Sequence, residues 1–66
     1  MKNTIKVERA KKSMTQADLA EKIGVSRQTI NAMEAGKYIP STLLALKIAA
    51  CFEVRVEDIF MLEDGE

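Results

Sequence analysis

Apolar residues recur along most of the chain at the spacing of a helix, not at the alternate positions of a strand. Between residues 16 and 23 the apolar positions are Ala17, Leu19, Ala20 and Ile23. Thr15 precedes this run and is a good N-cap, while Gly24 follows it where a left-handed residue can end a helix. The pattern predicts a helix that begins at about Gln16 and closes at Gly24.

A second short helix is predicted directly after this turn. Ser26 is a strong N-cap, and Val25 before it is placed to pack against Ile30 as a hydrophobic staple. The helix then covers about residues 27–35, and Gly36 closes it. Two short capped helices joined by a glycine turn are typical of a DNA-reading helix-turn-helix.

The remaining pattern predicts three further helices. One covers about residues 3–12 and carries Ile5, Val7 and Ala10 among charged residues. Another begins after Pro40 with Ser41 as its cap, and its apolar column is Leu43, Leu44, Leu46, Ile48, Ala49 and Phe52. The last is a short helix at about residues 57–61. We therefore predict an all-α domain over residues 1–62 and a frayed acidic tail at 63–66.

The helix at 27–35 has one apolar face and one polar face. At about 100° per residue, Ile30 and Met33 share the apolar face. The other side and its flanks carry Arg27, Gln28, Thr29, Asn31, Ala32 and Ala35. Arginine suits O6 and N7 of guanine, and glutamine or asparagine suits N6 and N7 of adenine. We therefore expect Arg27, Gln28 and Asn31 to read bases.

Several short motifs together resemble the lambda-repressor-like, Cro/C1-type (XRE) family of helix-turn-helix regulators. They are Thr15-Gln16 with Leu19-Ala20, Gly24-Val25-Ser26-Arg27-Gln28-Thr29-Ile30, Glu34 with Gly36-Lys37, and Val56-Glu57-Asp58-Ile59-Phe60. Each motif alone is weak, but their order and spacing extend the resemblance over nearly the whole chain. The resemblance implies a compact five-helix domain, a third helix that enters the major groove, and a dimer on a palindromic operator.

The resemblance, together with the free N–H groups of helix starts, also implies roles for single residues. Phosphate contacts are expected at Gln16, Ser26, Thr29, Lys37 and Tyr38. Gln16 would in addition brace the base-reading Gln28. Arg9 and Glu34 would form a structural ion pair between the first and third helices. Several relatives read a base from the position of Ala32, so this chain would read a shorter code or make a methyl contact there.

The length of 66 residues allows one small domain, whose core alone supplies only roughly 3–5 kcal/mol. Association is therefore an expected source of stability, and a homodimer is favoured. Phe60, Met61 and Leu62 exceed what so small a domain can cover, which makes them candidates for the dimer surface. The alternative is that Phe60 closes the core of the monomer.

Ten basic and ten acidic residues cancel to a net charge of zero, which at first argues against a nucleic-acid partner. The charges are separated along the chain, however. Residues 53–66 are acidic. Residues 1–12 are basic, since they contain one acid, Glu8, and the basic residues Lys2, Lys6, Arg9, Lys11 and Lys12. An acidic pole away from DNA would limit non-specific binding and make two half-sites necessary. The alternative is that the first helix simply has a solvated charged face.

Catalysis is not indicated. The chain has no histidine, one cysteine and no glycine loop of the kind that cradles phosphate, so the usual nucleophile, base and metal constellations are missing. Glu57 and Asp58 are adjacent on a helix and poorly aimed for shared acid–base work. Cys51 is interpreted as a buried small hydrophobe rather than a redox thiol. We expect no enzyme activity, no cofactor and no metal.

No apolar run approaches the roughly 20 residues that span a bilayer, and residues 1–9 lack the apolar core of a signal peptide. We expect the protein in the cytoplasm, at a prokaryotic or phage-derived nucleoid. The predicted function is sequence-specific binding of double-stranded DNA by a homodimeric transcriptional regulator, a repressor by occlusion. The rival interpretation is an antitoxin-like interaction module of the same fold, whose acidic C-terminal surface binds a basic protein.

Three residues depart from the family pattern. Ser13 and Glu53 stand where relatives often have a helix-ending glycine, so a positive φ there would carry strain of order 1 kcal/mol. Glu8 replaces an aliphatic residue. We expect it to be either semi-exposed and paired with Lys12, or an expensive buried acid.

Overall fold

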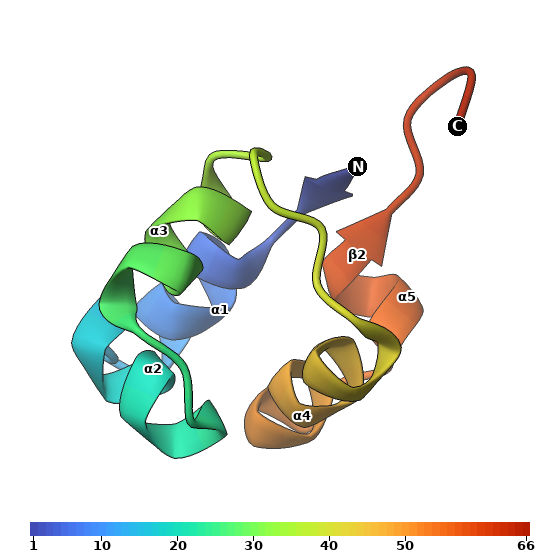
Figure 1. Cartoon of the computed structure of the whole chain (residues 1–66). Coiled ribbons are helices and arrows are strands. Elements are labelled where there is room, and N and C mark those ends of the chain that lie inside the picture. Colours follow the sequence, from blue (N-terminus) through green and yellow to red (C-terminus); the bar gives the residue numbers. More distant parts are fainter.

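A computed structural model describes all 66 residues and contains five helices and one small two-stranded sheet (Figure 1). The helices are α1 (Ile5–Lys11), α2 (Gln16–Ile23), α3 (Arg27–Glu34), α4 (Thr42–Phe52) and α5 (Val56–Ile59), and the strands are β1 (Lys2–Asn3) and β2 (Phe60–Met61). Figure 1 shows α2 and α3 on one side of the molecule and α4 and α5 on the other. The predicted all-α class is confirmed, with the sheet as a small addition.

Side-chain caps set the helix starts that the sequence predicted. The hydroxyl of Thr15 accepts the N–H of Asp18 at 3.0 Å, and the Asp18 carboxylate accepts the N–H of Thr15 at 2.9 Å, which completes a capping box. Ser41 caps α4 by accepting the N–H of Leu44 at 3.2 Å. Gly24 ends α2 with a φ of 75°, a left-handed conformation that glycine adopts without strain. Local chemistry therefore fixes the turn that orients α3.

The first and last helices are shorter than predicted, because the two ends of the chain pair with each other. β1 runs antiparallel to β2, with Asn3 opposite Phe60 and Lys2 opposite Met61. The N–H of Thr4 donates to the carbonyl of Ile59 at 2.9 Å. The predicted helices at 3–12 and 57–61 were therefore wrong at these ends, where the strands replace helical turns.

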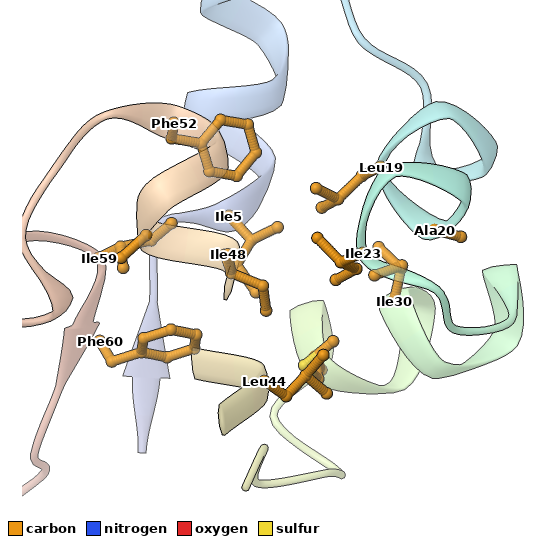
Figure 2. Close-up of a cluster of buried hydrophobic side chains, with 12 residues drawn as sticks. Ile5, Leu19, Ala20, Ile23, Ile30, Leu44, Ile48, Phe52, Ile59 and Phe60 are labelled. Atoms are coloured by element: carbon orange, nitrogen blue, oxygen red, sulfur yellow. The ribbon is translucent and has the colours of Figure 1, made fainter. Parts of the chain in front are cut away.

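Every helix contributes to one hydrophobic core (Figure 2). Ile5 of α1 and Ile48 of α4 lie near the middle of the view, between Leu19 and Ile23 on one side and Ile59 on the other. All the buried residues are hydrophobic, and no polar side chain is buried with them. The core holds the helix-turn-helix against α4 and α5 without relying on buried charges.

The apolar column predicted for α4 was only partly right. Leu44, Ile48 and Phe52, spaced four residues apart, are buried. Leu43 and Leu46 are 65% and 53% exposed, because at helical spacing they lie away from that stripe. α4 therefore carries large apolar side chains on its outer surface as well as on its inner one.

α1 is attached to the core by a single buried side chain, that of Ile5. Val7 and Ala10, which the pattern placed among the apolar positions of this helix, are exposed. Glu8 is semi-exposed and paired, but its partner is Lys11 at 3.2 Å and not the expected Lys12. The ion pair thus joins residues three apart, which lie on neighbouring positions of one helix face.

Both predicted departures in backbone conformation are present. Ser13 has a φ of 51° and Glu53 a φ of 57°, so each non-glycine residue occupies the left-handed region. Glu53 ends α4, and Ser13 lies in the turn between α1 and α2.

None of the five helices combines the length and the apolar character that a membrane span needs.

Candidate nucleic-acid interface

The recognition helix predicted at 27–35, here α3, is anchored at its start and along one face. Ser26 caps it by accepting the N–H of Thr29 at 3.1 Å. Ile30 and Met33 are fully buried. The Asn3 side chain donates to the carbonyl of Met33 at 2.8 Å and so ties the end of α3 to β1. These contacts fix how the opposite face of the helix is presented.

That opposite face is polar and accessible. Arg27, Gln28 and Asn31 are exposed, as their spacing predicted. Ala32 is half-buried beside them and adds only a methyl group. The guanidinium of Arg27 and the side-chain amide of Gln28 therefore lie on the first turn of α3, and the amide of Asn31 follows one turn later.

The expected phosphate contacts lie at the start of α3 and in the loop that follows it. The hydroxyls of Ser26 and Thr29 are 2.9 Å apart and share one hydrogen, so one O–H of the pair remains free to donate. Gly36 closes α3 with a φ of 75°, and Lys37 and Tyr38 after it are both exposed. Each of these groups is accessible to a phosphate beside α3.

Arg9 and Glu34 form an ion pair between α1 and α3. Arg9 donates to both carboxylate oxygens of Glu34, at 2.6 and 2.9 Å, and also to the carbonyl of Met14 at 2.9 Å. The two side chains are only 13% and 9% exposed. Burial alone would raise the pKa of Glu34, but the hydrogen bonds from Arg9 and Gln16 and the charge of Arg9 outweigh it and lower this pKa.

Gln16 has a different partner from the one that the family resemblance implied. Its Nε2 donates to Oε1 of Glu34 at 3.1 Å and to Oδ1 of Asn31 at 3.3 Å. It makes no hydrogen bond to Gln28, so the expected brace between the two glutamines is not formed. Instead, the carboxylate of Glu34 accepts the hydrogen bond from the Gln16 amide. Glu34 lies about one helical turn after Asn31 on α3.

The family resemblance had already paired Arg9 with Glu34. Sequence reasoning missed that Gln16 joins this pair and links it to Asn31. A usable signal was present, because Asn31 and Glu34 are three residues apart and share one edge of α3. Whether α2 lies over that edge depends on helix packing, which spacing alone does not give.

The three residues predicted for a dimer surface differ in how exposed they are in the structure. Phe60 is only 8% exposed and belongs to the core (Figure 2), in agreement with the alternative that it closes the monomer. Met61 is half-buried in β2, and Leu62 is 75% exposed. Further exposed large apolar side chains lie at Ile39 and on α4, at Leu43 and Leu46.

Other chemistry is sparse. No group of three or more His, Cys, Asp or Glu residues is placed to hold a metal ion. Cys51 is a free thiol on α4, half-buried against the core rather than fully buried. The polar face of α3 and its surroundings are therefore the best-developed candidate site.

The glycine turn between α2 and α3 and the exposed polar face of α3 define a helix-turn-helix DNA-binding domain. A family model described as helix-turn-helix (HTH_3) matches residues 5–59. The chain thus belongs to the Cro/C1-type (XRE) family of helix-turn-helix transcriptional regulators, which are DNA-binding proteins and not enzymes.

Known relatives agree with this assignment. The chain is 61% identical over 66 residues to an uncharacterized HTH-type transcriptional regulator of Methanocaldococcus jannaschii, with both chains covered completely. The structure matches the N-terminal DNA-binding domain of SinR from Bacillus subtilis with a TM-score of 0.76 and 30% identity, over 94% of this chain and 90% of that one. It also matches the SOS-response transcriptional repressor LexA of Eubacterium rectale with a TM-score of 0.80 and 29% identity, over 94% of this chain and 66% of that one.

Proposed function

We propose that this protein recognises a specific double-stranded DNA sequence as a homodimer, with α3 in the major groove. The observation that carries the proposal is the exposed row of Arg27, Gln28 and Asn31 on a capped helix whose other face is fully buried. A base contact requires donors and acceptors held in place, and the buried face supplies that rigidity. Arg27 suits guanine and Gln28 suits adenine.

Phosphate contacts would set the register of α3 on the duplex. The backbone N–H of Gln16 at the start of α2, the free O–H of the Ser26–Thr29 pair, and the side chains of Lys37 and Tyr38 are the proposed donors. They come from two helix starts and one loop, so they would hold the backbone on both sides of the reading helix. Lys37 is the cation whose contact would contribute to the salt dependence of binding.

Exposed apolar side chains support a dimer. Ile39, Leu43 and Leu46 are 66%, 65% and 53% exposed. Ile39 and Leu46 also line a mainly apolar groove of about 410 Å³, together with Val56 and Phe60. We call Ile39, Leu43 and Leu46 the apolar patch. A second copy would cover this patch with its own, because a two-fold interface places the same surface of both subunits together. The apolar area buried between the two subunits would add stability to a domain whose own core is small.

In such a dimer the two α3 helices would lie about one DNA turn apart, roughly 34 Å, and would read a palindromic operator. A dimer bound across a promoter excludes polymerase from the same DNA, so we propose that the protein acts as a repressor by occlusion. Its place of action would then be the nucleoid in the cytoplasm of a prokaryotic cell.

Selection of bound fragments from random duplex DNA tests this proposal. The expected result is a palindromic motif whose half-sites are about 10 base pairs apart, with affinity that falls as salt rises. Failure to enrich any sequence, in a protein that remains folded, would contradict it. An antitoxin-like interaction module would give that negative result.

A further inference from the structure

Four polar side chains form a continuous hydrogen-bonded series from α1 to the exposed face of α3. Arg9 donates to both oxygens of Glu34, and the Gln16 Nε2 group donates to Glu34 at 3.1 Å and to Asn31 Oδ1 at 3.3 Å. We call this series, Arg9–Glu34–Gln16–Asn31, the amide relay. Its inner end is a nearly buried ion pair, and its outer end is one of the proposed base readers.

The charge of Glu34 fixes which end of the Gln16 amide faces it. An ionised carboxylate only accepts hydrogen bonds, and the bidentate contact from Arg9 keeps Glu34 ionised. If Gln16 turned its oxygen toward Glu34, two acceptors would face each other and the contact would be repulsive. The NH2 group of Gln16 must therefore point at Glu34.

The same NH2 group fixes Asn31. One of its two hydrogens is used by Glu34, and the other reaches the nearest atom of the Asn31 amide, which must then be the oxygen. The Asn31 oxygen is thus engaged toward α2. Its NH2 group makes no hydrogen bond within the chain and belongs to an exposed side chain.

We propose that the amide relay makes Asn31 a donor to DNA whose discriminating partner is a base carbonyl in the major groove, O6 of guanine or O4 of thymine, because the remaining acceptor, N7, is common to both purines. This inference rests on the proposed DNA-binding function. An unconstrained asparagine reads adenine with its oxygen and its NH2 group together. Here the oxygen is turned toward Gln16 on α2, so the NH2 group is the part of the amide that is left to face a base.

The relay also changes the role of Gln16. Both hydrogens of its side-chain amide are used inside the protein, so only its backbone N–H is available to a phosphate. Gln16 is accordingly a positioning residue for Asn31, and Gln28, which has no bond to the relay, is independent of it.

The test first finds the base pair that Asn31 reads, as the pair at which Asn31→Ala stops discriminating in a selection from random duplex DNA. At that pair the carbonyl is removed in one duplex, with 2-aminopurine for guanine or 5-methyl-2-pyrimidinone for thymine. The amino group is removed in another, with purine for adenine or 2-pyrimidinone for cytosine. Comparison with Asn31→Ala on each duplex corrects for changes in the DNA itself.

Loss of the carbonyl should weaken binding of the wild-type protein roughly tenfold, and loss of the amino group should have little effect. Asn31→Asp, which offers only acceptors, should reverse that order. Gln16→Met should remove the preference for the carbonyl duplex, while the matched Gln28→Met variant should retain it. Both glutamine variants are compared only after circular dichroism shows native helix content.

Two results would overturn the inference while leaving the proposed function intact. One is a wild-type protein that selects a motif but loses more affinity with the amino group than with the carbonyl. The other is a motif whose preferences all survive Asn31→Ala. Selection of no motif by the wild-type protein would instead contradict the proposed function, and with it the DNA-reading role of Asn31.

Discussion

At the scale of residues, Arg9 and Glu34 join helices that have few other polar contacts between them. Both side chains are largely shielded from water, and Glu34 also receives a hydrogen bond from Gln16. Breaking such a pair leaves an uncompensated charge in a poorly solvated place. The pair therefore supports the fold and the interface at the same time.

Replacing Arg9 by methionine should lower the free energy of unfolding by about 3 kcal/mol, because Glu34 loses its bidentate partner while still desolvated. Urea unfolding followed by circular dichroism measures the change. The double variant Arg9→Met/Glu34→Leu should be less destabilised than the sum of the single changes. A single variant within about 0.5 kcal/mol of wild type would show that the pair is solvated and weak.

The ionised form of Glu34 also predicts how stability depends on pH. Its pKa is lowered in the folded protein, so its contribution is present above the ordinary glutamate pKa and is lost as pH falls through the lowered value. The stability advantage of wild type over Glu34→Gln should therefore be full at pH 6 and should shrink below about pH 4. Urea titrations at several pH values measure it.

Asp58 provides the control for that experiment, since its pKa is also lowered, by the hydrogen bonds from Arg55, but it is exposed. Asp58→Asn should change the pH dependence much less than Glu34→Gln does, because solvent screens the exposed pair. A difference between wild type and Glu34→Gln that stays constant with pH would contradict the account of Glu34.

At the scale of elements, the helix ends are determined by caps, and the end of α4 retains strain. Glu53 occupies the left-handed region with a φ of 57°. Glu53→Gly should raise the unfolding free energy by up to about 1 kcal/mol, since glycine adopts this conformation freely. Differential scanning calorimetry should show an increase of a few degrees in the melting temperature. A lower melting temperature would mean that the Glu53 side chain contributes more than its strain.

The elements predicted from sequence are those whose signals are local. Thr15, Ser26 and Ser41 cap the helices that their positions predicted, and Gly24 makes the turn. The strands were not predictable, because Asn3 and Phe60 pair across nearly the whole chain without a pattern of their own. Two-residue strands are too short to show alternation.

The candidate site divides in the same way. Helical spacing predicted the exposed positions of Arg27, Gln28 and Asn31, because a helix face follows from period alone. The partners of Gln16 depend on how α2 packs on α3, and no local rule supplies that. Phe60 shows the same limit, since it is buried in a strand that pairs with β1 from the other end of the chain.

At the scale of the whole molecule, the proposed dimer depends on the patch of Ile39, Leu43 and Leu46. Leu46→Glu should shift the protein from dimer to monomer in analytical ultracentrifugation, because a charge would be desolvated at the interface. Val7→Glu on α1 is a matched control, since both side chains are 53% exposed in the single chain. If both variants remained dimeric, the interface would lie elsewhere.

The central claim is that the outward face of α3 reads DNA sequence, and binding by three proteins to cognate and scrambled duplexes over a range of salt tests it most directly. Gln28→Ala should lose on the order of 1–3 kcal/mol on the cognate duplex and little on the scrambled one. Lys37→Ala should weaken both duplexes alike and reduce the salt slope by about one. Equal losses on both duplexes for Gln28→Ala, with no change in salt dependence for Lys37→Ala, would contradict the account.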